Sequence, residues 1–163
     1  MTQATPLMAG KRGLVMGVAN DKSIAWGVAR ACAAHGASLA FTYQGEALGK
    51  RVKPLAESVG STSVIECDVA RDGETEAAVA QAADALGGLD FLVHAVAFAN
   101  KDELKGRYVD TSRENFLQAL DISCFSFTNA ARAASAAMTD GGSLLTLSYY
   151  GAERVMPHYN VMG

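Results

Sequence analysis

The chain opens with a short apolar run that stops at a glycine and is followed by a helical pattern. Leu14, Val15 and Met16 form the apolar run, Gly17 ends it, and the helical pattern covers residues 23–35. This order predicts a strand, a tight loop and the start of a helix. Such a helix start presents unpaired backbone N–H groups and the positive end of the helix dipole to the loop. Because a pyrophosphate fits there, nucleotide binding is the first hypothesis.

Small residues in and after this loop support that hypothesis. Gly17 permits a turn directly after the strand, and the small Ala19 also leaves room for a phosphate. Ser23 is expected to cap the helix and to offer its hydroxyl to a phosphate, and Gly27 to let the helix pack close to the strand. Five residues separate Gly17 from Ser23, which is not the spacing of the G-x-G-x-x-G motif. A glycine-rich connection without a ligand is therefore the alternative.

Apolar strand patterns and helical patterns alternate along the rest of the chain. Strands are predicted at residues 37–44, 63–67, 90–95 and 143–148, and helices at residues 46–59, 73–86 and 112–138. We expect Pro54 to break or kink the helix that contains it. This alternation predicts an α/β fold whose parallel sheet is covered on both faces. The natural topology is a Rossmann-like, doubly wound sheet in the order 3-2-1-4-5, within one dinucleotide-binding domain over residues 1–163.

Small and polar residues follow the strands at the ends where such sheets bind ligands. They are residues 17–24, Gln44, Asp68 with Val69, residues 94–99 and residues 148–150. Any one of them alone could be ordinary loop chemistry. Since the carboxyl ends of parallel strands meet at one edge of the sheet, the sequence predicts that they converge on one crevice.

Gln44 and Asp68 bear on the identity of the nucleotide. A dinucleotide site usually has an acid after the second strand, whereas Gln44 is a neutral amide that can bond a ribose without repelling a 2′-phosphate. NAD is favoured because no arginine lies immediately beside Gln44, and NADP is not excluded. Asp68 could accept from the adenine amine while Val69 packs on the ring; Asp68 as the N-cap of the next helix is an equally good interpretation.

Composition and charge limit the kinds of partner, compartment and metal site that this chain can have. The formal net charge of −3, without a basic stripe, makes nucleic acid an unsuitable partner. No apolar run approaches the ~20 residues that cross a bilayer. The three cysteines, Cys32, Cys67 and Cys124, lie far apart in apolar pattern and are interpreted as reduced thiols of a cytoplasmic protein. The three histidines are scattered, so no metal site is expected.

A second candidate site lies in the last twenty residues. Pro157 is well placed to open a helix, which would put Tyr159 in its first turn near the crevice. A tyrosine beside a nicotinamide can donate a hydrogen bond or a proton to a substrate oxygen on which negative charge develops. The alternative is an aromatic side chain that only packs on the sheet.

Five segments together resemble one known family. They are residues 17–27, 41–44, 67–69, 145–154 and 157–163, and the last reads Pro157-His-Tyr-Asn-Val-Met-Gly163. They are similar to the enoyl-[acyl-carrier-protein] reductases of bacterial fatty-acid synthesis, a divergent branch of the short-chain dehydrogenase/reductase superfamily. The resemblance covers the chain from Lys11 to Gly163.

The resemblance implies a role for ten residues. Gly17, Ser23 and Ile24 would hold the pyrophosphate, Gln44 the adenosine side, Asp68 and Val69 the adenine, Val96 the nicotinamide end and Ala99 the acyl substrate, while Tyr149 and Tyr159 match the catalytic tyrosines. It implies reduction of the trans-2 double bond of an enoyl-acyl carrier protein by NADH, in a homotetramer. Two rivals stay open: a conventional short-chain ketone or alcohol reductase, and a non-catalytic nucleotide-binding module.

Three departures from related patterns stand out. The wider superfamily has Tyr-x3-Lys, whereas position 163 here is glycine. The lysine of the enoyl reductases lies further along, beyond Gly163. Ala95 and Ala97 replace a serine and a glycine of many relatives, which are small-for-small changes. The resemblance therefore implies an N-terminal portion of a longer enzyme, truncated after the fifth strand and impaired as it stands.

Overall fold

A five-stranded parallel sheet forms the centre of the protein. The computed structural model describes residues 6–163, so residues 1–5 of the predicted domain lie outside the described residues. The strands are β1 (Arg12–Met16), β2 (Ser38–Tyr43), β3 (Ser63–Glu66), β4 (Phe91–His94) and β5 (Ser143–Thr146). Their order is β3-β2-β1-β4-β5, and in the parallel register Val15 pairs with Phe41 on one side and Val93 on the other. The predicted Rossmann-like topology is confirmed.

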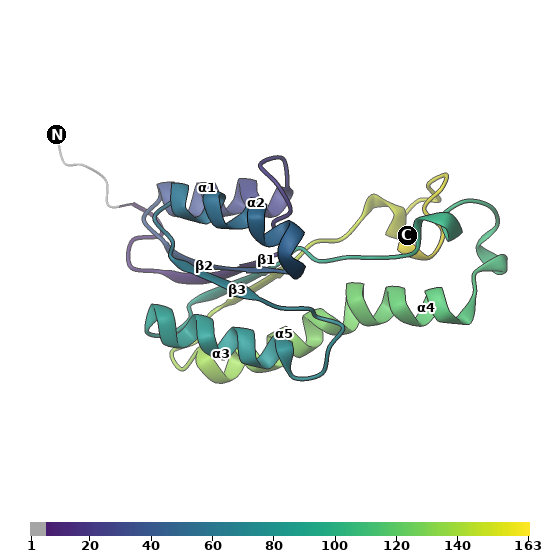
Figure 1. The fold of residues 1–163 in the computed structure, drawn as a ribbon. Helices are drawn as coiled ribbons and strands as arrows, with labels where there is room; N and C mark the ends of the chain where they lie inside the picture. The colour runs from purple at the N-terminus through teal and green to yellow at the C-terminus, as the bar shows by residue number, and fades with distance from the viewer. Residues whose placement is uncertain (1–5) are drawn as a thin grey trace.

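Helices cover both faces of the sheet (Figure 1). Helices α1 (Ile24–Ala34) and α2 (Gly45–Ser58) lie on one face, and α3 (Glu74–Leu86) and α5 (Ser126–Ala137) lie on the other. Trp26 and Phe41 belong to the buried cluster under α1 and α2, while Leu14, Leu92 and Ala130 belong to the cluster under α3 and α5. The central strands β1, β2 and β4 are thus mostly buried from both sides, whereas all residues of the edge strand β5 are exposed. Within residues 6–163, no helix has both the length and the apolar character to cross a membrane.

The long helix predicted over residues 112–138 is interrupted. It consists of α4 (Arg113–Leu120), a π-helical turn over Asp121–Phe125, and then α5. Ser112 caps α4, because its Oγ accepts from the N–H of Asn115 at 3.1 Å. A π-helical turn accommodates one extra residue, which changes the direction of the side chains within it. In Figure 1, α4 extends beyond the sheet at the carboxyl ends of the strands.

Pro54 does not break its helix, and the expectation that Pro157 opens a helix is wrong. Helix α2 continues through Pro54 to Ser58, because Val52 and Ala56 are fully buried against the sheet and hold the helix there. Pro157 does not open an α-helix: residues 157–159 form a turn, and only the short 3₁₀ turn Asn160–Met162 follows. His158 and Asn160 have positive φ angles of 60° and 39°, which a right-handed helix does not permit.

Candidate functional site

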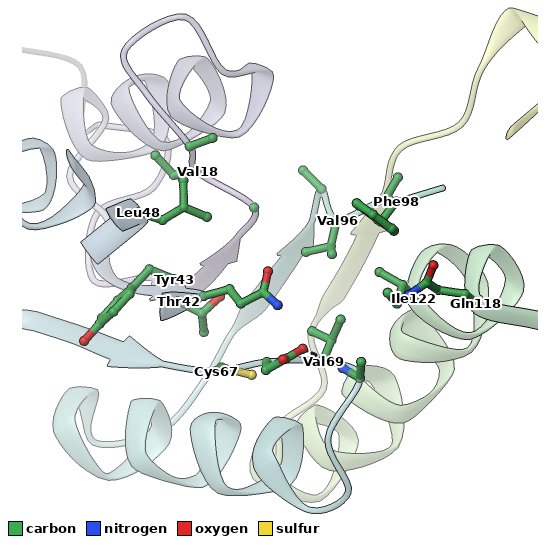
Figure 2. A pocket seen from close by; sticks show the side chains of 17 residues that line it. Val18, Thr42, Tyr43, Leu48, Cys67, Val69, Val96, Phe98, Gln118 and Ile122 are labelled. Carbon is green, nitrogen blue, oxygen red and sulfur yellow. Dashed lines mark hydrogen bonds between the residues drawn. The ribbon is translucent and has the colours of Figure 1, made fainter. Parts of the chain in front are cut away.

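A cavity of about 400 Å³ opens at the carboxyl ends of the first four strands (Figure 2). Its walls come from the loop after β1, the end of β2 with the start of α2, and the segments after β3 and β4. The last turn of α4 and the π-helical turn that follows it complete the lining. The lining residues are Gly17, Val18, Ala19, Thr42, Tyr43, Gln44, Leu48, Cys67, Asp68, Val69, Ala70, Ala95, Val96, Ala97, Phe98, Gln118 and Ile122. The structure therefore brings Gly17, Gln44, Asp68, Val69 and Val96 together in one crevice.

Gly17 is required by its conformation and by its neighbour. Its φ angle is +96°, which side chains rarely adopt, and a Cβ at this position would overlap the backbone carbonyl of Ala95. The N–H of Ala95 in turn donates to the carbonyl of Met16 at 3.1 Å. Gly17 thus lets β1 and the segment after β4 meet closely at the floor of the cavity.

Ser23 organises the loop rather than the helix. Its Oγ accepts from the N–H groups of Ala19 and Asn20, both at 3.0 Å, and it makes no capping bond to α1. The expected cap is therefore wrong, because the hydroxyl oxygen is already used within the loop. The Ser23 O–H remains available as a donor. Neither Ser23 nor Ile24 lines the cavity, and Ile24 is 68% exposed.

The expected role of Gly27 is also wrong. Gly27 is exposed, and a Cβ built on it would meet no atom within 4 Å. Helix α1 instead packs on the sheet through Ala25, Trp26 and Ala29, which are all buried.

Asp68 and Gln44 both line the cavity, from the ends of the neighbouring strands β3 and β2. Asp68 Oδ1 accepts from the N–H of Ala70 at 3.1 Å, and the N–H of Asp68 donates to Glu74 Oε2 at 2.7 Å. Gly73, not Asp68, is the N-cap of α3, so the interpretation of Asp68 as a helix cap is not supported. Gln44 precedes α2 without capping it by its side chain. Among the described residues the Gln44 amide therefore remains free for a ligand, whereas Asp68 Oδ2 lies 3.6 Å from Arg71 Nε in an ion pair.

Two of the three basic side chains that follow Gln44 on α2, Lys50 and Lys53, already have partners. Lys50 Nζ lies 2.8 Å from Glu46 Oε1, one helical turn away on α2. Lys53 Nζ lies 5.4 Å from the centre of the Tyr43 ring, within range of a cation–π contact. An acidic side chain, Glu46, thus stands in the first turn of α2 after Gln44.

The segment after β4 is fixed by side chains from the α4–α5 region. The N–H of Phe98 donates to Ser123 Oγ at 3.0 Å, and the N–H of Asn100 donates to Asn115 Oδ1 at 2.8 Å. Ala99 lies between these two attachments and is half-buried, but it does not line the cavity. The sequence analysis did not identify Ser123 or Asn115 as site residues. Their only signal is that both are polar residues inside the helix predicted over residues 112–138.

His94, at the end of β4, forms a buried polar link. Its Nε2 lies 2.8 Å from Ser126 Oγ and its Nδ1 lies 3.3 Å from Thr146 Oγ1. The Ser126 hydroxyl donates to the carbonyl of Ile122 at 2.6 Å, so its oxygen accepts from Nε2–H, and Nδ1 accepts from Thr146. Burial lowers the pKa of His94 to about 4, so the imidazole is neutral. This link joins β4, β5 and the start of α5.

The two candidate tyrosines lie together beyond β5. The rings of Tyr149 and Tyr159 are 5.4 Å apart between centroids and meet edge to face at 77°. Burial, with a smaller contribution from Tyr159, raises the pKa of the Tyr149 phenol. Asn160 ties this segment to the chain after β4, since its Nδ2 donates to the carbonyl of Glu103 at 2.9 Å. Neither tyrosine lines the cavity.

Comparison with known proteins identifies related chains. Residues 17–163 match the family model described as enoyl-(acyl carrier protein) reductase. The enoyl-[acyl-carrier-protein] reductase [NADH] 1 of Rhizobium meliloti is 56% identical over all 163 residues, which are 60% of that protein. Two crystal structures match 98% of this chain and 62% of their own: the reductase of Candidatus Liberibacter asiaticus (48% identity, TM-score 0.94) and that of Anaplasma phagocytophilum in complex with NAD (57%, 0.93).

The extent of these matches settles the family. The chain spans about 60% of the length of the curated relatives. The match to the family model covers nearly all of the chain and includes the glycine that shapes the cavity floor as well as both tyrosines. The chain belongs to the enoyl-(acyl carrier protein) reductase family.

Proposed function

We propose that this chain forms the cofactor-binding domain, over residues 1–163, of an NADH-dependent enoyl-acyl carrier protein reductase of fatty-acid synthesis. The observation that carries the proposal is the cavity at the strand ends, where Gly17, Gln44, Asp68, Val69 and Val96 meet in a chain of this family. Ligands of doubly wound sheets bind at this edge. The printed names of the relatives supply the reaction and the carrier protein.

The residues of the cavity fit a dinucleotide. The loop after Gly17 would receive the pyrophosphate, with the free Ser23 O–H as a donor and Ile24 at the helix start. Gln44 would bond the adenosine ribose, and Asp68 with Val69 would hold the adenine, as amine acceptor and apolar surface. Val96 would lie against the nicotinamide. The cofactor would supply the hydride, and the protein would align it and stabilise charge.

NADH suits the adenosine end better than NADPH. Glu46 stands in the first turn of α2 after Gln44, and its carboxylate neutralises Lys50. A 2′-phosphate on the ribose would need a free cation beside Gln44, and Arg51, the arginine of α2, stands seven residues further along the chain. NADPH remains the second cofactor to test.

The two tyrosines would act on the acyl substrate. Tyr159 would hydrogen-bond the thioester oxygen as enolate charge forms on it, and Ala99 would contact the acyl chain. Tyr149 packs edge to face on Tyr159, and burial raises the pKa of its phenol. Tyr149 would thus orient Tyr159 and provide a second donor.

Partners and location follow from the same assignment. We propose enoyl-acyl carrier protein as substrate, a homotetramer and a cytoplasmic location. Exposed apolar side chains support an assembly: Phe116 and Leu120 on α4 are 37% and 45% exposed, and Phe125 is 56% exposed.

The test is turnover by the complete protein with a crotonyl thioester and NADH, followed by NADH absorbance. The proposal predicts reduction of the thioester and a large loss of kcat in the Tyr159→Phe variant. Reduction of simple ketones instead would favour a conventional short-chain reductase. NADH binding without turnover of either substrate would favour a non-catalytic module.

A further inference from the structure

One wall of the cavity has no regular secondary structure of its own. Val96 and Phe98 line the cavity from the segment that follows β4 (Figure 2). The Phe98 side chain is 49% exposed, so packing alone does not hold this segment in place. Val96 packs against the buried cluster under α3 and α5, so the part of the segment that depends on backbone bonds is the part around Phe98.

Ser123 bonds both backbone groups of Phe98. Its Oγ accepts from the Phe98 N–H at 3.0 Å, and its O–H donates to the Phe98 carbonyl at 3.1 Å. A single hydroxyl thus replaces both partners that a neighbouring strand would have supplied. Ser123 is in the π-helical turn between α4 and α5, where the extra residue changes side-chain directions.

The same turn, with the end of α4, also lines the cavity next to this segment. Ile122, which directly precedes Ser123, lines the cavity, as does Gln118 one turn earlier. Figure 2 shows both beside the segment that carries Phe98. On the other side, Ser126 bonds the carbonyl of Ile122 and the buried ring of His94. The turn is therefore anchored to β4 while it holds Phe98, and it sets the distance between two walls of the cavity.

We propose that Ser123 is a positioning residue of the reductase. Through the backbone of Phe98 it holds the segment from Val96 to Ala99 at the nicotinamide and acyl end of the cavity. This inference rests on the proposed function, which assigns that end to the reacting groups. A displacement of the segment changes the alignment of hydride and substrate and leaves the pyrophosphate and adenosine ends unaffected.

The first experiment measures kinetics in the complete enzyme. We expect Ser123→Ala to lower kcat/KM for a crotonyl thioester roughly five- to tenfold, the effect of one lost hydrogen-bond anchor, while the NADH dissociation constant stays within about twofold. Ser123→Thr keeps the hydroxyl and recovers the rate. Cys124→Ala, an exposed neighbour in the same turn, serves as the matched control and keeps the wild-type rate.

The second experiment needs no substrate and is independent of the proposed function. Amide hydrogen exchange of Phe98, measured by NMR, should be roughly two- to tenfold faster in Ser123→Ala and return to the wild-type rate in Ser123→Thr. Unchanged exchange and kcat/KM in Ser123→Ala would overturn the inference, as would an equal loss in Cys124→Ala. A third result would separate the two proposals. If the wild-type enzyme does not reduce the thioester but Phe98 exchanges faster in Ser123→Ala, the proposed function is refuted, while the role of Ser123 in holding Phe98 still stands.

Discussion

The buried histidine at the end of β4 makes the stability of the protein depend on pH. His94 is 1% exposed, and burial lowers its pKa from 6.5 to about 4. In the unfolded chain the ring takes up a proton near pH 6.5, whereas in the folded protein it stays neutral until about pH 4. The unfolded state therefore binds more protons between these values, and stability decreases as pH decreases through this window.

The size of the effect follows from the difference between the two pKa values. Each unit is worth about 1.4 kcal/mol. Between pH 7.5 and 4.5, His94 should therefore lower the free energy of unfolding by roughly 2 to 3 kcal/mol. This is a large part of the 5–15 kcal/mol, roughly, that holds a typical domain together.

Urea unfolding followed by the fluorescence of Trp26, the single tryptophan, measures this change. The His94→Gln variant can bond Ser126 without titrating, so it should lose roughly 2 to 3 kcal/mol less than the wild type over this range. His35→Gln removes an exposed histidine and should behave as the wild type. The hydrogen bond from Arg12 lowers the pKa of Asp90. Protonation of Asp90 should therefore lower the free energy of unfolding at still lower pH, equally in all three proteins. Equal pH dependence in wild type and His94→Gln would refute the reasoning.

Three further predictions test the site. Gly17→Ala should lower the free energy of unfolding by more than about 1–2 kcal/mol, which is the cost of the positive φ angle alone, and should abolish NADH binding. The matched control is Gly27→Ala, because a Cβ at Gly27 meets no other atom. It should raise the free energy of unfolding by ~0.5–1 kcal/mol. Ser23→Ala should weaken NADH binding roughly two- to tenfold, and Ser23→Thr should restore it. Because burial raises the pKa of Cys67 to about 11, a thiol reagent at pH 8 should label the exposed Cys124 much faster.

Each of these predictions has a result that contradicts it. If Gly27→Ala lowers the stability as much as Gly17→Ala does, the loss at Gly17 does not come from the close contact with Ala95 or from the positive φ angle. If Ser23→Ala binds NADH with the wild-type affinity, the Ser23 hydroxyl does not contact the cofactor. Equal labelling of the two thiols in the folded protein would contradict the burial of Cys67.

The fold was predictable because its determinants are local or periodic. Short apolar runs such as residues 14–16 and 91–93, separated by helical patterns, leave few alternatives to a parallel sheet with right-handed crossovers. The convergence of Gly17, Gln44 and Asp68 then follows from topology alone. These features need no knowledge of which side chains touch.

The details that failed depend on which side chains and backbone groups touch in the folded chain. Nothing around Ser123 reveals that its hydroxyl meets Phe98, 25 residues earlier, and this contact accompanies a π-helical turn in a segment that reads as one helix. Ser23 reads as a cap, yet its oxygen is taken up by loop N–H groups. Pro54 is tolerated because burial of the surrounding α2 residues outweighs the local cost.

The most direct test of the central claim is a crystal structure of the complete protein with NADH. Our account predicts the pyrophosphate against the loop after Gly17, the adenine between Asp68 and Val69, and the nicotinamide beside Val96. A dinucleotide bound elsewhere, with the cavity at the strand ends empty, would contradict it.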